Sequence, residues 1–425
     1  MRFFGPTVAL ASLLGALALF TGCDGGGPTG QDKCVARVPA TAVVSGGGME
    51  RPPLGAPTTE PAFGPCVERV SDHIGHHDNT AVHVGARAQA FNADGTVVLL
   101  RNGQVLRLSD KVLVGQFPSA DSAWVWSPEN ANVAYAILGN AVVAFDYVAQ
   151  AQTVVQRFAR YQRLLSESGL SLPSRQNQWA LGGELPQTNE APAVKELFLW
   201  NANTQATTSA VVVSPDVVGR VFSPRWMQAV PSGEGLVVAW APGDQPFSGI
   251  ELYDQQGARV RQLMSQTPVC DVALDARLKS WLVCVEPAGN AAPAFTIAKH
   301  ALSVAPAPAE PLLGVAIDHA VELSCAAHGT DTCVMGVTGG NSETPFAGEV
   351  TAFSLNGRVD APAVWRLAHH NSALAAITSQ SVVNCPIEPS AVMPHATLDR
   401  TAQRVLFGSN WATNCFAELY LIDFR

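Results

Sequence analysis

Histidines are the residues of this chain whose types and spacing come nearest to a set of metal ligands. Four histidines and two aspartates stand between residues 72 and 83: Asp72, His73, His76, His77, Asp78 and His83. Neutral imidazoles and carboxylates bind divalent transition metals. Their spacing fits no ligand helix, however, and the alternative is a polar loop that crosses one face of the fold. We favour the loop, which would place His76 and His77 on a ligand-binding surface.

A second set of candidate metal ligands lies near the C-terminal end and consists of His369, His370 and His395. Other side chains suit a ligand surface: Arg101, Arg225, Trp226 and Trp411. Tryptophan is equally expected in the packing between strands, so both interpretations stay open for the two tryptophans.

Sequence motifs of catalysis are missing from this chain. It contains no G-x-S-x-G elbow, no phosphate-binding Walker loop, no H-E-x-x-H pair and no EF-hand loop. Asp94 and Asp399 are acidic, but aspartate in a hairpin turn bonds to the backbone there. We therefore expect a protein that is not an enzyme, with no catalytic residue and no cofactor.

The first residues predict export. Arg2 precedes a run from Val8 to Phe20 that is apolar except for Ser12, and small residues follow it. Such a run is too short to span a bilayer as a mature helix and is typical of a signal peptide over residues 1–22. No second run of about 18 apolar residues follows, so we expect no transmembrane segment in the mature chain.

The end of this leader, Leu19-Phe20-Thr21-Gly22-Cys23, resembles the lipobox of bacterial lipoproteins. The resemblance implies that Cys23 is lipidated and becomes the first residue of the mature chain; plain secretion is the alternative. Residues 23–65 would then form a tether and an arm rich in proline and glycine. Attachment to the bilayer through acyl chains places the protein in the cell envelope, at the outer membrane or cell surface rather than the inner membrane.

Eight of the nine cysteines remain when Cys23 is set aside, an even number that favours disulfides in an exported chain. In two pairs the cysteines stand symmetrically about a turn, so they would face each other across a hairpin at a distance that suits a disulfide. These pairs are Cys270–Cys284 and Cys325–Cys333. By elimination and nearness the others are Cys34–Cys66 and Cys385–Cys415. A zinc site is the alternative, but no CxxC spacing supports it.

A repeat of short strands extends over residues 66–425. Each copy has a short apolar strand, a turn with Asp, Pro or Gly and a more continuous apolar strand, as in Ala88–Leu100 and His395–Phe407. Such a repeat with almost no helix predicts an all-β fold, a β-propeller. Seven starts favour seven blades, with six or eight blades or a β-sandwich as alternatives. Only residues 158–170 look helical.

Closure of the ring follows from one extra strand. The alternating segment Cys66–Ser71 precedes the first repeat and has no blade of its own. We expect it to pair with the blade that contains Glu418–Phe424, which would remove an exposed sheet edge.

Three blade motifs resemble the TolB-like and WD40-like propellers of exported bacterial proteins: Phe91–Thr96, Trp126–Asn130 and Leu406–Trp411. The segment from Met393 to Trp411 also resembles a blade of oligogalacturonate lyases, which hold manganese through histidines and a glutamine. His395 matches their second histidine. Met393 replaces the first, and no glutamine lies just upstream, so that metal site would be degenerate.

The predicted cellular location and fold together suggest a function. A net charge of −9 excludes nucleic acid as a partner, because no basic stripe is present to neutralise phosphates. We expect a lipid-anchored envelope propeller that binds a protein partner or acts as a scaffold. The alternatives are a metal-dependent carbohydrate-active enzyme and a structural component without a ligand of its own.

Overall fold

The computed structural model describes the chain in segments: residues 38–44, 49–73, 80–83, 85–165, 171–186, 194–214, 223–241, 247–288, 295–303, 305, 307–315, 320–338, 344–372, 393–412 and 416–424. Every regular element in these segments is a β-strand. Within them, no helix is long and apolar enough to cross a membrane.

The strands form seven sheets. The first contains β4 (Val97–Leu99), β5 (Gln104–Arg107) and β6 (Leu113–Gln116). The second contains β7 (Val125–Trp126), β8 (Val133–Leu138), β9 (Ala141–Asp146) and β10 (Ala151–Arg157). The third contains β11 (Arg163–Leu164), β12 (Gln178–Glu184), β13 (Lys195–Asn201) and β14 (Val211–Val213). The fourth contains β15 (Pro224–Ala229), β16 (Gly235–Trp240), β17 (Ile250–Asp254) and β18 (Arg259–Met264).

The remaining sheets complete the ring. The fifth contains β19 (Cys270–Leu274), β20 (Ser280–Pro287), β21 (Phe295–Ala301) and β22 (Glu310–Val315). The sixth contains β23 (Val321–Ser324), β24 (Thr332–Val337), β25 (Glu349–Ser354) and β26 (Val364–His369). The seventh joins β1 (Thr58–Thr59), β2 (Cys66–Arg69) and β3 (Thr80–Ala81) to β27 (Thr397–Leu398), β28 (Arg404–Ser409) and β29 (Ala417–Asp423).

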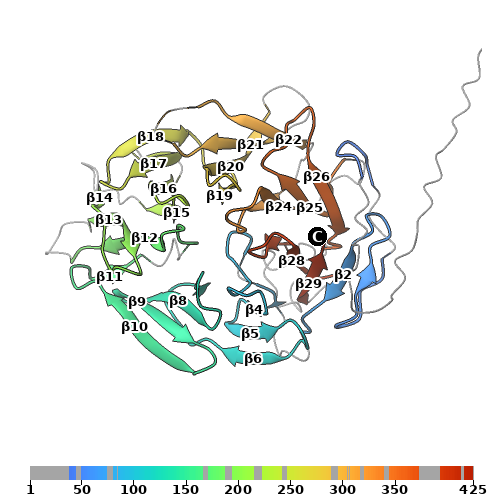
Figure 1. Ribbon diagram of the computed structural model, residues 1–425, viewed down its shortest axis with the longest axis horizontal. Coiled ribbons are helices and arrows are strands. Elements are labelled where there is room, and N and C mark those ends of the chain that lie inside the picture. Colours follow the sequence, from blue (N-terminus) through green and yellow to red (C-terminus); the bar gives the residue numbers. More distant parts are fainter. Residues whose placement is uncertain are drawn as a thin grey trace, which may run out of the picture.

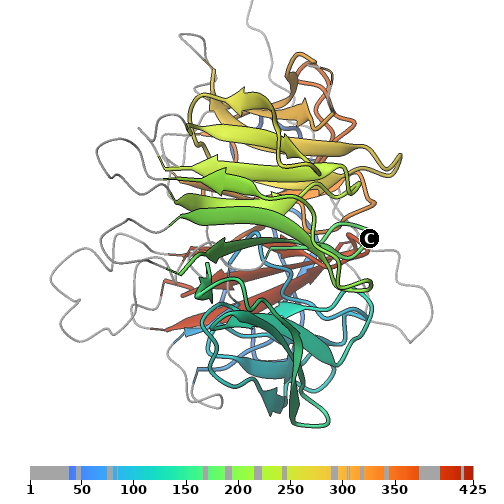
Figure 2. The same cartoon turned by 90° about the vertical axis from the view of Figure 1, so that its left-hand side faces the viewer.

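These sheets stand around one axis in chain order (Figure 1), and Figure 2 shows them stacked side by side. The strands β15 and β19 lie near the axis, whereas β18 and β22 lie at the rim (Figure 1). The chain is a seven-bladed β-propeller. The predicted fold class and the favoured blade number are confirmed, and the alternatives of six blades, eight blades and a β-sandwich are excluded.

The seventh blade is built from both ends of the chain. Strand β2 pairs antiparallel with β29, and Val67 lies opposite Ile422. The predicted closure is therefore confirmed, although β2 ends two residues before the predicted segment. The buried carboxylate of Glu418 on β29 strengthens the joint, because it accepts hydrogen bonds from Arg51 and from His73 Nδ1, the latter over 2.7 Å.

Turns between strands explain the recurring aspartates. In the β19–β20 turn, Asp275 Oδ1 accepts hydrogen bonds from the backbone N–H groups of Arg277 and Lys279. Its Oδ2 accepts a bond from the indole of Trp281. Asp399 has the same role before β28, where it accepts bonds from the backbone of Gln403 and Arg404. These aspartates shape hairpins, as predicted for Asp94 and Asp399.

Two disulfides join the hairpins that the cysteine spacing predicts. Cys270 lies opposite Cys284 in the register of β19 and β20, with an S–S distance of 2.09 Å. Cys325 and Cys333 are joined at 2.05 Å. The other pairs cannot be compared in the same way: Cys34, Cys385 and Cys415 lie outside the described residues, as does Cys23, and Cys66 forms no disulfide with a described cysteine.

The helix predicted over 158–170 is wrong for the described part, residues 158–165. A turn follows Phe158, and β11 then pairs with β12. The helix-like spacing of apolar residues has another cause: Tyr161 stacks on Phe198, and Leu164 and Leu165 are buried beside β12. Contacts with a neighbouring strand therefore outweigh local helix propensity here.

A small substitution at the contact between β2 and β29 should destabilise the protein markedly. Replacing the fully buried Val67 by alanine removes methyl groups at the contact between the two ends of the chain, and should lower the free energy of unfolding by about 1 to 3 kcal/mol. Replacing Val112, which is 47% exposed, by alanine should change it by about 0.5 kcal/mol or less. Denaturant unfolding of both variants measures the difference. Equal effects would contradict a role for β2 in holding the ring.

Candidate functional site

A cavity of about 680 Å³ lies around the axis of the ring. All seven blades or the segments that lead into them contribute to its wall: 85–88, 123–125, Ser171, 225–228, 267–270, 320–323, Met393 and His395. Its size is typical of ligand pockets in proteins. Because every blade supplies part of the wall, the cavity exists only when the ring is closed.

Two arginines form one side of the cavity. Arg87 lies with its guanidinium 5.1 Å from the ring centre of Trp226, and Arg225 donates a hydrogen bond to Thr267 Oγ1 over 3.2 Å. Both side chains are exposed, and the cavity that they line is open to solvent. Burial lowers the pKa of Arg87, the charge of Asp271 opposes this shift, and the charge of Arg225 adds to it. Arginine stays protonated near neutral pH, so both groups remain cations.

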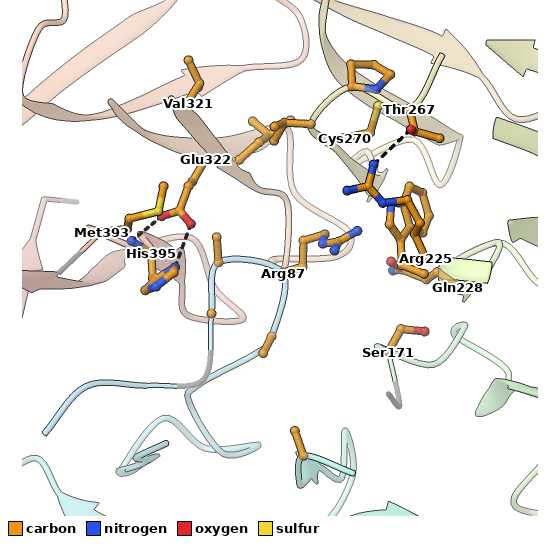
Figure 3. A pocket seen from close by; sticks show the side chains of 18 of the residues that line it. Arg87, Ser171, Arg225, Gln228, Thr267, Cys270, Val321, Glu322, Met393 and His395 are labelled. Carbon is orange, nitrogen blue, oxygen red and sulfur yellow. Dashed lines mark hydrogen bonds and ion pairs between the residues drawn. The ribbon is translucent and has the colours of Figure 1, made fainter. Parts of the chain in front are cut away.

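Unpartnered polar groups lie on the same side (Figure 3). Gln228 is only 4% exposed, and its Nε2 has no hydrogen-bond partner in the described structure. The hydroxyl of Ser171 is likewise buried without a described partner. A buried donor without an acceptor is costly, and in native proteins it often marks a ligand or water site.

The opposite side holds an acid and a histidine. Glu322 Oε1 lies 2.8 Å from His395 Nδ1, and its Oε2 accepts a hydrogen bond from the backbone N–H of His395 over 2.7 Å. His395 has a left-handed backbone with a φ of 42°. Figure 3 shows Glu322, Met393 and His395 together, across the cavity from Arg87 and Arg225.

The C-terminal histidines do not converge on a metal in this geometry. His369 Nδ1 contacts Glu60, its Nε2 contacts the carbonyl of Val44, and its ring stacks on Phe63. His370 donates from Nε2 to the carbonyl of Val337, and its Nδ1 accepts the N–H of Ser372. Protein groups thus occupy both ring nitrogens of His369 and His370, while His395 is bound to Glu322 on the cavity wall.

The described N-terminal histidines, His73 and His83, also lie in different environments and do not form one site. His83 is buried, and its Nε2 bonds to the carbonyl of His395 over 2.5 Å, so the expectation of an exposed loop is wrong for this residue. His73 lies at the closure joint, where it stacks on Phe416. Asp72, His73 and Glu418 bring ligand atoms within 4.8 Å, but Arg51 and Arg69 already bind that glutamate. The predicted residues His76 and His77 lie outside the described segments.

The remaining surface candidates divide between the cavity and the core. Trp226 and Arg225 line the axial cavity. Arg101 is exposed beside a smaller cavity of about 210 Å³ between the first two blades. The interpretation of Trp411 as a ligand-surface residue is wrong, because it is only 7% exposed and stacks on Tyr420 as part of the blade packing.

Four cavity residues escaped the sequence analysis: Arg87, Ser171, Gln228 and Glu322. A weak signal existed for two of them. Gln228 in β15 and Glu322 in β23 are polar residues inside strands that are otherwise largely apolar. Such residues on an inner strand face either the axis or a polar partner.

No protein-family model matches the chain, and no curated protein matches it. Among solved structures, oligogalacturonate lyase from Vibrio parahaemolyticus is similar, with a TM-score of 0.57 and 11% identity over 87% of this chain and 96% of that chain. The β-propeller domain of the trilobed protease from Pyrococcus furiosus has a TM-score of 0.42 and 11% identity over 76% and 84% of the two chains. TolB from Acinetobacter baumannii has a TM-score of 0.34 and 15% identity over 66% and 62%. The likeness is one of fold alone.

Buried histidines predict an unusual titration. Burial lowers the pKa of His83 to about 3 and those of His328 and His370 to about 4, whereas contacts with Glu60 raise that of His369 against the effect of burial. The rings of His83, His328 and His370 should therefore stay neutral in the folded protein as the pH falls from 6.5 towards 4. The same histidines take up protons in the unfolded chain over this range. The folded state therefore loses stability relative to the unfolded state as the pH falls. NMR titration of the ring protons measures each pKa. Titration of all four near pH 6.5 would contradict the burial.

Proposed function

We propose that this chain is a lipid-anchored propeller of the bacterial cell envelope that binds a protein partner at the mouth of its axial cavity. The signal-peptide-like leader supports this location, because an apolar run is followed by small residues and then by Cys23. Acylation at Cys23 would hold the propeller at the outer membrane or cell surface. More than one acyl chain gives stable anchoring.

One observation carries the binding function. The axial cavity combines accessible cations with buried donors that lack partners, and this combination on a rigid closed ring suits recognition of a partner group. The blade strands fix the wall and carry some of its binding residues, such as Arg225 and Gln228 on β15, while others, such as Arg87, lie on segments that lead into the blades. The wall also contains tryptophan, methionine and arginine, side chains that are enriched in protein interfaces.

A metal-dependent enzyme for acidic carbohydrates is the second candidate, favoured by the structural likeness to an oligogalacturonate lyase. The arrangement of histidines supports it less well, because both ring nitrogens of His369 and His370 are engaged by protein groups. Stoichiometric manganese in the purified protein, together with cleavage of acidic glycans that is lost in His395→Ala, would establish the enzyme instead.

Anchoring has a direct test. Wild-type protein should fractionate with membranes and incorporate a labelled fatty acid, and Cys23→Ala should lose the label because the acceptor sulfur is absent. The leader variant Ser12→Ala should behave like wild type. Equal labelling of Cys23→Ala would refute lipidation at this residue.

Partner binding has a positional test. A photo-crosslinking residue at Ala123, in the cavity wall, should give a discrete adduct in cells. The same residue at Val148, which is 63% exposed in the β9–β10 turn, should not give that adduct. Absence of adducts at Ala123, or identical adducts at both positions, would contradict binding at the cavity.

A further inference from the structure

We propose that the axial cavity is a carboxylate site, in which Arg87, Arg225 and Gln228 bind an acidic side chain of a protein segment that enters along the axis. This inference rests on the proposed partner-binding function and specifies the chemistry of the partner. The chain as a whole is acidic, with a net charge of −9, so a cationic cavity is a local feature rather than a reflection of composition.

Neither arginine of the cavity forms an ion pair with a described carboxylate; their contacts are with Trp226 and Thr267. Its lining contains four ionisable side chains: Arg87, Arg225, Glu322 and His395. The one acid among them is engaged by His395 on the opposite side. Asp271, whose charge acts on Arg87 and offsets part of it, uses its oxygens to accept backbone N–H groups of Val272 and Cys325 rather than to bind a guanidinium. The two guanidinium groups are therefore available to an incoming anion.

The donors near these cations complete the site. The buried Nε2 of Gln228 and the buried hydroxyl of Ser171 lack described partners, and both residues line the cavity beside the arginines. Figure 3 shows Arg87, Arg225, Gln228 and Ser171 on the same side of the cavity. A carboxylate only accepts hydrogen bonds, and it can accept several at once, so it would satisfy groups that the protein leaves unpaired.

Local contacts restrain both arginine side chains before a ligand binds. The guanidinium of Arg87 lies over Trp226, and the bond from Arg225 to Thr267 restrains the second guanidinium. Binding then loses less side-chain entropy than it would with two free arginines. The forked guanidinium matches a carboxylate better than a lysine ammonium does.

The rest of the wall favours a peptide over an acidic glycan. Most of its other side chains are aliphatic: Ala86, Val125, Met227, Val269, Val321, Leu323 and Met393. Aromatic faces that could stack on a sugar ring are occupied, since Arg87 lies over Trp226, and Trp124 packs against Phe117 and Phe145. A segment that alternates acidic and aliphatic residues matches both parts of this wall. Glu322 would keep the acidic group on the arginine side by repulsion.

The test uses two blocked hexapeptides, one of alternating leucine and aspartate and one of alternating leucine and asparagine, with trigalacturonate as the glycan probe. Calorimetry with the purified full-length chain should detect only the aspartate peptide. Arg87→Gln and Arg225→Gln should each weaken its binding about tenfold, because each removes a guanidinium that would hydrogen-bond the carboxylate. Arg277→Gln is the matched control, since Arg277 is exposed in the turn at the other end of β19 and should leave binding unchanged.

Each other outcome overturns the carboxylate site. Equal binding of the asparagine peptide would show that charge is not recognised, and binding of trigalacturonate alone would assign the cavity to glycans. Arg225→Lys keeps the charge and should lose less affinity than Arg225→Gln, which guards against a loss caused by misfolding. If the Ala123 adduct persists unchanged in the Arg87→Gln and Arg225→Gln double variant, the carboxylate site is wrong while partner binding stands.

Discussion

The pairing of β2 with β29 is the interaction on which the other features depend. A ring of sheets built in chain order has no covalent link between its first and last blades, so its last sheet presents an open edge to solvent. Here a strand from before the first blade covers that edge, with Val67 opposite Ile422. The buried Glu418 then gathers Arg51, Arg69 and His73 at the joint. Hydrogen bonds thus join the two ends of the described propeller.

Closure has a consequence at the axis. Seven blades meet there without filling the space, and a cavity of about 680 Å³ remains. Its wall uses residues from every blade or from the segment that leads into it, so a small displacement of one blade would separate Arg87 or Ser171 from Arg225 and Gln228, which share β15. The closed ring therefore fixes the arrangement of these polar groups, some on inner strands, as Arg225 and Gln228 are on β15, and others, such as Arg87, on the segments between strands.

Local patterns were predictable from sequence because their physics is local. Cys270 and Cys284 could be paired because a hairpin fixes which residues lie opposite each other, and Asp275 and Asp399 signal turns for the same reason. The closing strand was predictable because it was an alternating segment without a partner. In contrast, the sequence placed His83 in an exposed loop and left Trp411 open between surface and core, because their burial depends on packing with residues that are distant in the chain. Arg87 carries no motif, and only its position on the axis gives it a role.

Native-state hydrogen exchange tests the central claim, that closure makes the ring and its cavity one cooperative unit. The amide protons of Glu68 in β2 and of Val70 just after it, which face β29, should exchange only with global unfolding, at the same free energy of opening as those of Val283 and Val285 in β20, far around the ring. Exchange of the β2 amides through a separate opening of much lower free energy, while β20 stays protected, would contradict this account.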